Sequence, residues 1–207
     1  MATAETVGPS NPQHYLWWFP GCPVKVHLAL RVVQRLKNRL SDVGDLSPEE
    51  GLLFGGTREG ATEILDFQPV TNTSVRNVVA GLPAERKSSL VGYYRTETGE
   101  AFHLDEQDLS LAQECFAKPY HVFLIVHHNR FGPPTATFFF HDRDGRMADF
   151  AFLEFPLDPS LLAAEQQGRM QRSHQAMDQP LAVALPAPFP RRVLTPLPRS
   201  ARITVRF

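Results

Sequence analysis

The segment from Val91 to Asp108 constrains the fold of this chain more than any other. It begins with the apolar and aromatic run Val91-Gly-Tyr-Tyr, which belongs to a strand predicted over Ser89–Tyr94. A loop containing Gly99 follows. Asp105 then has the chemistry of a helix N-cap, and Asp108 lies three residues on, near the positive helix end. Functional sites often lie where a strand passes through a loop into a helix, so we take this junction as the candidate site.

The residues before this junction predict one helix and two strands. Apolar residues recur at helical spacing from Val26 to Leu40, which predicts a helix. Glu49–Gly56 has the pattern of a short buried strand bounded by glycines, and Glu63–Val70 that of a second strand. A hairpin through Thr57–Ala61 would join them. Thr71–Arg86 is expected to be a polar connection that can include a helical turn.

The residues after the junction predict a helix and a meander of three strands. The helix begins at Asp105 and is stopped by Lys118-Pro119. The three strands are expected at Tyr120–His127, Thr135–His141 and Met147–Phe155. A turn over Asn129–Pro134 joins the first two, and a tight turn of the Asp-Gly type over Asp142–Gly145 joins the last two. This order of elements indicates the α+β class with a mixed or antiparallel sheet.

Composition narrows the class of protein. With 207 residues, 43% of them hydrophobic, the chain can form one globular domain with a full core plus tails. The net charge of -1 argues against a general nucleic-acid binder. Two cysteines, Cys22 and Cys115, are too few for a disulfide scaffold, so we expect a reducing, cytoplasmic location. Neither a signal peptide nor a membrane span is indicated.

The sequence suggests a division into three parts. Residues 1–22 are expected to be an N-terminal tail with the aromatic segment His14-Tyr-Leu-Trp-Trp-Phe-Pro20. That segment either folds back over the core, which we favour because large aromatics stabilise mainly by burial, or anchors a partner. Residues 23–158 are expected to form the compact domain, and residues 159–207 a Pro/Arg-rich C-terminal tail or linker.

The C-terminal part differs sharply in charge from the rest. The last 48 residues carry a net charge of +5, whereas the first 159 carry -6. A helix is expected from Leu161 to Gln175, followed by a proline-rich stretch. The strand-like run Ala201–Phe207 has the pattern of a segment that pairs with a sheet edge.

Motifs at the junction and upstream of it are similar to those of a known family. Gly51-Leu-Leu-Phe-Gly55 matches a Gly-Leu-Leu-x-Gly strand, Val91-Gly-Tyr-Tyr matches an apolar lead-in, and Leu104 and Asp108 match a helix start. From Val24 to Pro156 the chain thus resembles the MPN (JAB1/MPN/Mov34) domain. The resemblance implies an MPN/cytidine-deaminase-like three-layer arrangement, with a central mixed β-sheet and helices packed on it. Active members, the JAMM zinc isopeptidases, carry His-x-His at the strand end and Ser-x-x-Asp at the helix start.

The zinc ligands of the active members are replaced in this chain. Arg95 and Glu97 stand at the two histidine positions, and Asp105 stands at the Ser position. Asp108 alone keeps its register. The family's upstream glutamate position is Pro48, with Glu49 and Glu50 following it. The vestigial active-site positions are therefore Glu50, Arg95, Glu97, Asp105 and Asp108.

These replacements are incompatible with the zinc chemistry that the resemblance describes. A JAMM site needs two neutral imidazoles and a carboxylate on the metal, with water in the fourth position. Arg95 has no lone pair and carries a permanent positive charge. We expect it to replace the charge of the metal by pairing with Asp108, and with Glu97 or Asp105. Asp105 would oppose an oxyanion that the family's Ser helps to hold.

Other polar residues offer weaker alternatives. Glu97, His103, Asp105 and Asp108 could form an oxygen-rich metal site, but an acidic loop with one helix cap is the interpretation we favour, because Arg95 lies among these ligands.

The histidine pair and the cysteines are also expected to be structural. His127 and His128 point to opposite faces of a strand and cannot easily chelate one ion. Cys115 is interpreted as a buried small hydrophobe and Cys22 as an exposed thiol that nothing marks as activated.

The sequence leaves three hypotheses of function. The first is a non-catalytic MPN-like scaffold that binds a protein partner or itself, without zinc or another cofactor. The second is a metal-dependent isopeptidase-like or peptidase-like hydrolase with altered ligands. The third is a binder of a small carboxylate or a peptide tail in the vestigial cleft, with Arg95 as the carboxylate-binding group.

Overall fold

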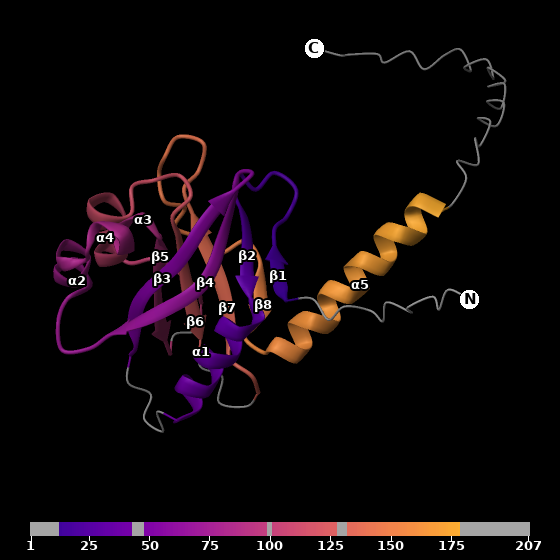
Figure 1. The fold of residues 1–207 in the computed structure, drawn as a ribbon, viewed down its shortest axis with the longest axis horizontal. Helices are drawn as coiled ribbons and strands as arrows, with labels where there is room; N and C mark the ends of the chain where they lie inside the picture. Colours follow the sequence, from indigo (N-terminus) through magenta and orange to yellow (C-terminus); the bar gives the residue numbers. More distant parts are fainter. Residues whose placement is uncertain (1–12, 43–47, 99–100, 128–131, 179–207) are drawn as a thin grey trace, which may run out of the picture.

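One mixed β-sheet organises the chain. The computed structural model describes residues 13–42, 48–98, 101–127 and 132–178. Within these ranges, eight strands form a curled sheet in the order β1-β2-β4-β3-β5-β6-β7-β8 (Figure 1). They are β1 (His14–Trp17), β2 (Lys25–Ala29), β3 (Glu50–Arg58), β4 (Ala61–Val70), β5 (Leu90–Glu97), β6 (Val122–His127), β7 (Thr135–Phe140) and β8 (Glu154–Pro156). The β2/β4 and β5/β6 pairs are parallel and the other neighbours are antiparallel.

Helices cover both faces of this sheet, which confirms the predicted α+β class with helices packed on a central mixed sheet. They are α1 (Leu30–Asp42), α2 (Val75–Gly81), α3 (Ala84–Ser88), α4 (Glu106–Cys115) and α5 (Pro159–Asp178). Leu36 of α1 and Leu162 of α5 belong to the core on one face. Val75 of α2 and Leu111 of α4 belong to the core on the other. Figure 1 shows α2 and α4 gathered at the end of the sheet away from α5.

The helix predicted over Val26–Leu40 is wrong for its first four residues. Lys25–Ala29 is strand β2, and the helix begins only at Leu30. Val26 and Leu28 are fully buried, which is the two-residue alternation of a strand. Val26 and Leu30 are also four residues apart, so the same apolar positions fit a helix, and only pairing with β1 and β4 decides between the two.

Two further segments differ from the prediction. Of the strand expected over Met147–Phe155, only Glu154–Pro156 forms a regular strand, while Met147 and Phe150 make isolated bridges to His141 and His103. The connection expected over Thr71–Arg86 contains two helices, α2 and α3, instead of one turn. Strands β3, β4, β6 and β7 lie within two residues of their predicted limits. Strand β5 runs three residues past its predicted end at Tyr94, and β1 was not predicted as a strand. The expected turn Asn129–Pro134 and the run Ala201–Phe207 fall wholly or partly outside the described residues.

The aromatic N-terminal segment folds back onto the core, as we favoured. Trp17 is fully buried in β1, and its indole N–H donates to the carbonyl of Leu153 at 2.9 Å. The free edge of β1 is covered by α5, because Leu16 N–H donates to Gln166 and the Leu16 carbonyl accepts from Arg169. Thus β1, from residues 1–22, and α5, from residues 159–207, both pack against the body formed by residues 23–158. The division of the chain at these boundaries stays a prediction.

No helix in the described ranges is both long and apolar enough to cross a membrane.

We predict that acid destabilises the fold through His121, the buried residue directly before β6. Burial lowers its pKa to about 4, from about 6.5 in an unfolded chain. The unfolded state therefore takes up a proton first as the pH falls. The contribution of neutral His121 is complete above pH ~6.5 and is lost between pH ~6.5 and ~4, a loss of about 3 kcal/mol. Urea unfolding of the wild type and of His121→Gln across this pH range measures the loss of stability. An equal pH dependence in both proteins would show that His121 is not its source.

Candidate functional site

The predicted strand–loop–helix junction is present and is fixed by a reciprocal helix cap. β5 ends at Glu97 and α4 begins at Glu106. The Asp105 carboxylate accepts from the Asp108 N–H at 2.8 Å, and the Asp108 carboxylate accepts from the Asp105 N–H at 3.1 Å. This capping box is the one that the spacing of the two aspartates indicates. Asp108 is buried and therefore faces the strands instead of solvent.

Arg95 binds the carboxylates of Glu97 and Asp108, and not that of Asp105. Its Nη2 lies 2.8 Å from Asp108 Oδ2, and its Nη1 lies 2.5 Å from Glu97 Oε2. Nε donates to both Asp108 oxygens at 3.1 Å, and Nη2 also donates to the His103 carbonyl at 3.0 Å. The exposed fractions of the three side chains are 16%, 11% and 5% for Arg95, Glu97 and Asp108. Burial opposes the charged guanidinium, but hydrogen bonds to the two carboxylates outweigh it and raise the pKa of Arg95.

A histidine from the neighbouring strand completes this network. In the parallel β5/β6 register, Glu97 lies opposite His127, and the two side chains are in contact through Glu97 Oε1 and His127 Nε2. The buried imidazole is stacked on Phe102, with 3.7 Å between ring centroids. The network therefore joins β5, β6 and α4 through Asp108, Arg95, Glu97 and His127.

The donors at the junction do not fit a zinc ion. Arg95, in a histidine position of the resembled family, supplies only N–H donors, and both neighbouring carboxylates already accept from it. Asp105 is engaged as the helix cap, and the His103 ring contacts the Ala101 carbonyl. Across the described ranges, no group of three or more His, Cys, Asp or Glu residues is arranged to hold a metal ion.

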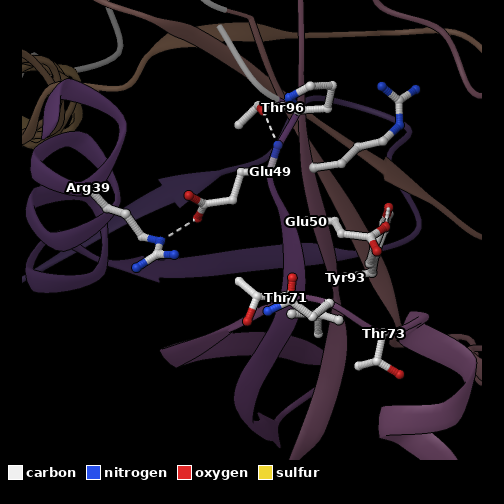
Figure 2. Close-up of a pocket in the computed structure, with 11 residues that line it drawn as sticks. Arg39, Glu49, Glu50, Thr71, Thr73, Tyr93 and Thr96 are labelled. Carbon is white, nitrogen blue, oxygen red and sulfur yellow. Dashed lines mark hydrogen bonds and ion pairs between the residues drawn. The ribbon is translucent and has the colours of Figure 1, made fainter. Parts of the chain in front are cut away.

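A cavity of about 580 Å³ lies beside the junction (Figure 2). It is lined from four parts of the chain that are distant in sequence: the end of α1, the start of β3, the loop after β4 and the end of β5. Its lining residues are Arg39, Pro48, Glu49, Glu50, Val70, Thr71, Asn72, Thr73, Tyr93, Arg95 and Thr96. A smaller cavity of about 240 Å³ shares Glu50, Tyr93 and Arg95 with it. This cavity adds the charged residues Arg76, Asp105 and Asp108, of which Arg76 is paired with Glu114. We call the two together the junction cleft.

The two adjacent glutamates at the start of β3 have different partners. Glu49 Oε1 lies 2.7 Å from Arg39 Nε and also accepts from the Tyr94 hydroxyl at 2.7 Å. Glu50 Oε2 accepts from the Tyr93 hydroxyl at 3.0 Å. Burial, and next the nearby negative charge of Glu50, raise the pKa of Tyr93, so this hydroxyl stays a donor. In the β3/β5 register the backbone of Glu50 lies opposite that of Arg95, so Glu50 is next to the junction.

Four of the five predicted vestigial positions thus line one cavity: Glu50, Arg95, Asp105 and Asp108. Glu97 joins them through Arg95. Sequence reasoning missed Arg39 and Tyr93 as lining residues and His127 as a network member. Tyr93 and Arg95 are both in β5, two residues apart, and so share a face of the strand, which is a signal that could have identified Tyr93.

Neither cysteine is activated. Both side chains are half-buried, and burial raises the pKa of each thiol. The expectation of an exposed Cys22 is therefore wrong, because Cys22 packs against the core and its thiol contacts the Val24 carbonyl.

Comparison with known proteins gives only distant structural likeness. No family model and no curated protein matches the sequence. A solved protein from Salinibacter ruber is 16% identical with a TM-score of 0.42, over 62% of this chain and 96% of that chain. One from Desulfitobacterium hafniense is 13% identical with a TM-score of 0.44, over 63% and 91%. A JAB1/MPN domain protein from Archaeoglobus fulgidus is 13% identical with a TM-score of 0.34, over 60% and 95%. Likeness at this level assigns neither a family nor an activity.

Proposed function

We propose that this protein is a non-catalytic, MPN-like interaction module in which Arg95 occupies the place of a catalytic metal. The observation that carries the proposal is the saturation of Arg95 by Asp108, Glu97 and the His103 carbonyl. A guanidinium in this position neutralises the carboxylates that would otherwise attract a cation. The vestigial positions then stabilise the fold, and the surface around them is available for a protein partner or for self-association.

The other two hypotheses find less support in this geometry. Hydrolysis by the JAMM route requires a metal-bound water and a group that stabilises an oxyanion. Here the metal position holds a cation from the protein, and the Ser position holds Asp105, a carboxylate that caps α4. A carboxylate ligand would have to compete with Asp108 and Glu97 for Arg95, so the carboxylate-binding hypothesis loses its main group.

We predict that the wild-type protein purifies without stoichiometric zinc and is not stabilised by Zn²⁺, Mn²⁺ or Mg²⁺. A ligand that binds only the folded state raises the melting temperature, so a thermal-shift series with the three metals measures this directly. Elemental analysis provides the second measurement. One zinc per chain that is lost in Asp108→Asn would contradict the proposal.

A matched variant tests the positional argument behind this prediction. Arg95→His/Glu97→His restores two imidazoles beside Asp108, the ligand set that zinc prefers. We expect this variant alone to gain zinc-dependent thermal stability. If neither protein responds to zinc, the alignment of Arg95 and Glu97 with the histidine positions is wrong. If both respond, the role assigned to Arg95 in the wild type is wrong.

A further inference from the structure

Glu50 differs from the other charged side chains that line the larger cavity. Arg39 and Glu49 are paired with one another, and Arg95 is held by Asp108 and Glu97. Glu50 has one hydrogen-bond donor, the Tyr93 hydroxyl on Oε2, and no basic side chain of the described residues lies within ion-pair distance of it. It also borders both parts of the junction cleft. The cleft is therefore suited to a cationic group, the opposite sign from the carboxylate expected from the sequence.

The chain itself contains a segment with the complementary charge. Residues 179–207, which lie outside the described ranges, contain five arginines and no Lys, Asp or Glu, a net charge of +5. Residues 1–178 carry a net charge of -6. Opposite charges of this size attract over about a Debye length, ~8 Å at physiological ionic strength. They therefore favour the encounter of residues 179–207 with the rest of the chain.

The segment is long enough to reach the cleft. α5 starts beside α1, because Asp158, which precedes it, is paired with Lys37 at 2.5 Å, and α1 also carries Arg39 of the cleft. The 20 residues of α5 span about 30 Å, so its far end lies roughly that distance from α1. From residue 179 to Arg199 an extended chain spans up to ~70 Å. The arginines from 199 onward can therefore return to Glu50.

We propose that the junction cleft is the docking site for an arginine of residues 179–207 of the same chain, with Glu50 as the carboxylate that receives the guanidinium. Thr71, Asn72 and Thr73 line the same cavity and offer hydroxyl and amide acceptors for its remaining N–H groups. Attachment to the body keeps the segment at a high effective concentration, so a weak contact suffices. This assignment rests on the proposed non-catalytic role, because it requires a cleft without a metal.

The experiment uses the full chain with its tail arginines neutralised as the receptor. The substitutions are Arg191→Gln, Arg192→Gln, Arg199→Gln, Arg202→Gln and Arg206→Gln. A fluorescent peptide with the sequence of residues 186–207 is titrated with this receptor, and anisotropy reports binding. We expect Glu50→Gln in the receptor to weaken binding about tenfold or more. Glu154→Gln, an equal change of charge at the exposed first residue of β8, should change binding less than about twofold.

The wild-type chain provides the test for docking within one molecule. Its own segment should compete, so the peptide should bind wild type several-fold more weakly than the neutralised receptor, and the two chains should sediment with the same oligomeric state. Equal weakening by Glu50→Gln and Glu154→Gln would show general attraction to an acidic body and overturn the proposal. The proposal would also be overturned if the peptide did not bind, or if the wild type formed a dimer that the arginine substitutions abolish.

Melting curves of each variant confirm that it is folded. Failure of this inference is distinguishable from failure of the proposed function. Zinc binding or hydrolysis would refute the non-catalytic role, whereas loss of the peptide interaction alone refutes only the docking site.

Discussion

Replacing Arg95 with methionine is expected to destabilise the protein by about 3–5 kcal/mol, the usual cost of removing one partner from a buried ion pair. Methionine keeps much of the side-chain volume, so the loss is mainly electrostatic. Glu97 and Asp108 are 11% and 5% exposed, and each would lose its only arginine partner among the described residues. For a domain of this size the melting temperature should fall by ~10 °C. Calorimetry or urea unfolding at neutral pH measures the effect.

Two matched variants separate this explanation from a general effect of losing an arginine. Arg76→Met breaks the pair with Glu114, whose side chains are 42% and 52% exposed, and should cost at most about 1 kcal/mol. The triple variant Arg95→Met/Glu97→Gln/Asp108→Asn removes the charges together and should recover more than half of the loss. Similar costs for Arg95→Met and Arg76→Met would show that the junction network is not a main source of stability.

Replacing Trp17 with alanine is the second large effect, with an expected loss of about 4–5 kcal/mol. Trp17 is fully buried and contacts the rings of Phe138 and Phe140 at 5.4 and 5.9 Å between centroids. Its removal leaves a cavity and takes away one donor to the Leu153 carbonyl, which also accepts from the Thr137 hydroxyl. Because Trp17 joins β1 to the strands at the other end of the sheet, this variant tests whether the N-terminal segment is part of the folded body.

The neighbouring tryptophan is the control. Trp18 is 37% exposed, and its ring has Lys25 Nζ at 5.6 Å from the centroid. Trp18→Ala should therefore cost about 1 kcal/mol or less. Equal melting temperatures for the two variants would mean that β1 does not contribute to the core as described.

Local signals in the sequence were sufficient to predict the junction. The capping box between Asp105 and Asp108 depends on two residues that are three positions apart, so the helix start could be predicted from the local sequence alone. The glycine-bounded strand β3 and its hairpin to β4 were also predicted. At Gly55, an added Cβ would lie 1.8 Å from the Glu63 carbonyl oxygen, so the close approach of the two strands requires glycine.

The prediction failed where a local pattern has two solutions. Val26 and Leu28 alternate as in a strand, while Val26 and Leu30 are spaced as in a helix, and pairing with β1 and β4 selects the strand. Phe150 was expected within the strand Met147–Phe155. In the structure this residue is 56% exposed, and Met147 and Phe150 make isolated bridges instead of belonging to a regular strand. In both segments the local preference of the residues for helix or strand does not decide the structure. The neighbouring strands that are available for hydrogen bonding decide it.

The sequence by itself predicted the order of most elements and the capped junction, and it supplied the hypothesis that Arg95 and Glu97 stand where the resembled family has two histidines. Only the tertiary structure decided which side chains those residues contact. The β3/β5 register places Glu50 opposite Arg95, and the β5/β6 register places Glu97 opposite His127. Because a one-residue slip in a strand sends every side chain to the other face, contacts across strands depend on a register that no single segment specifies.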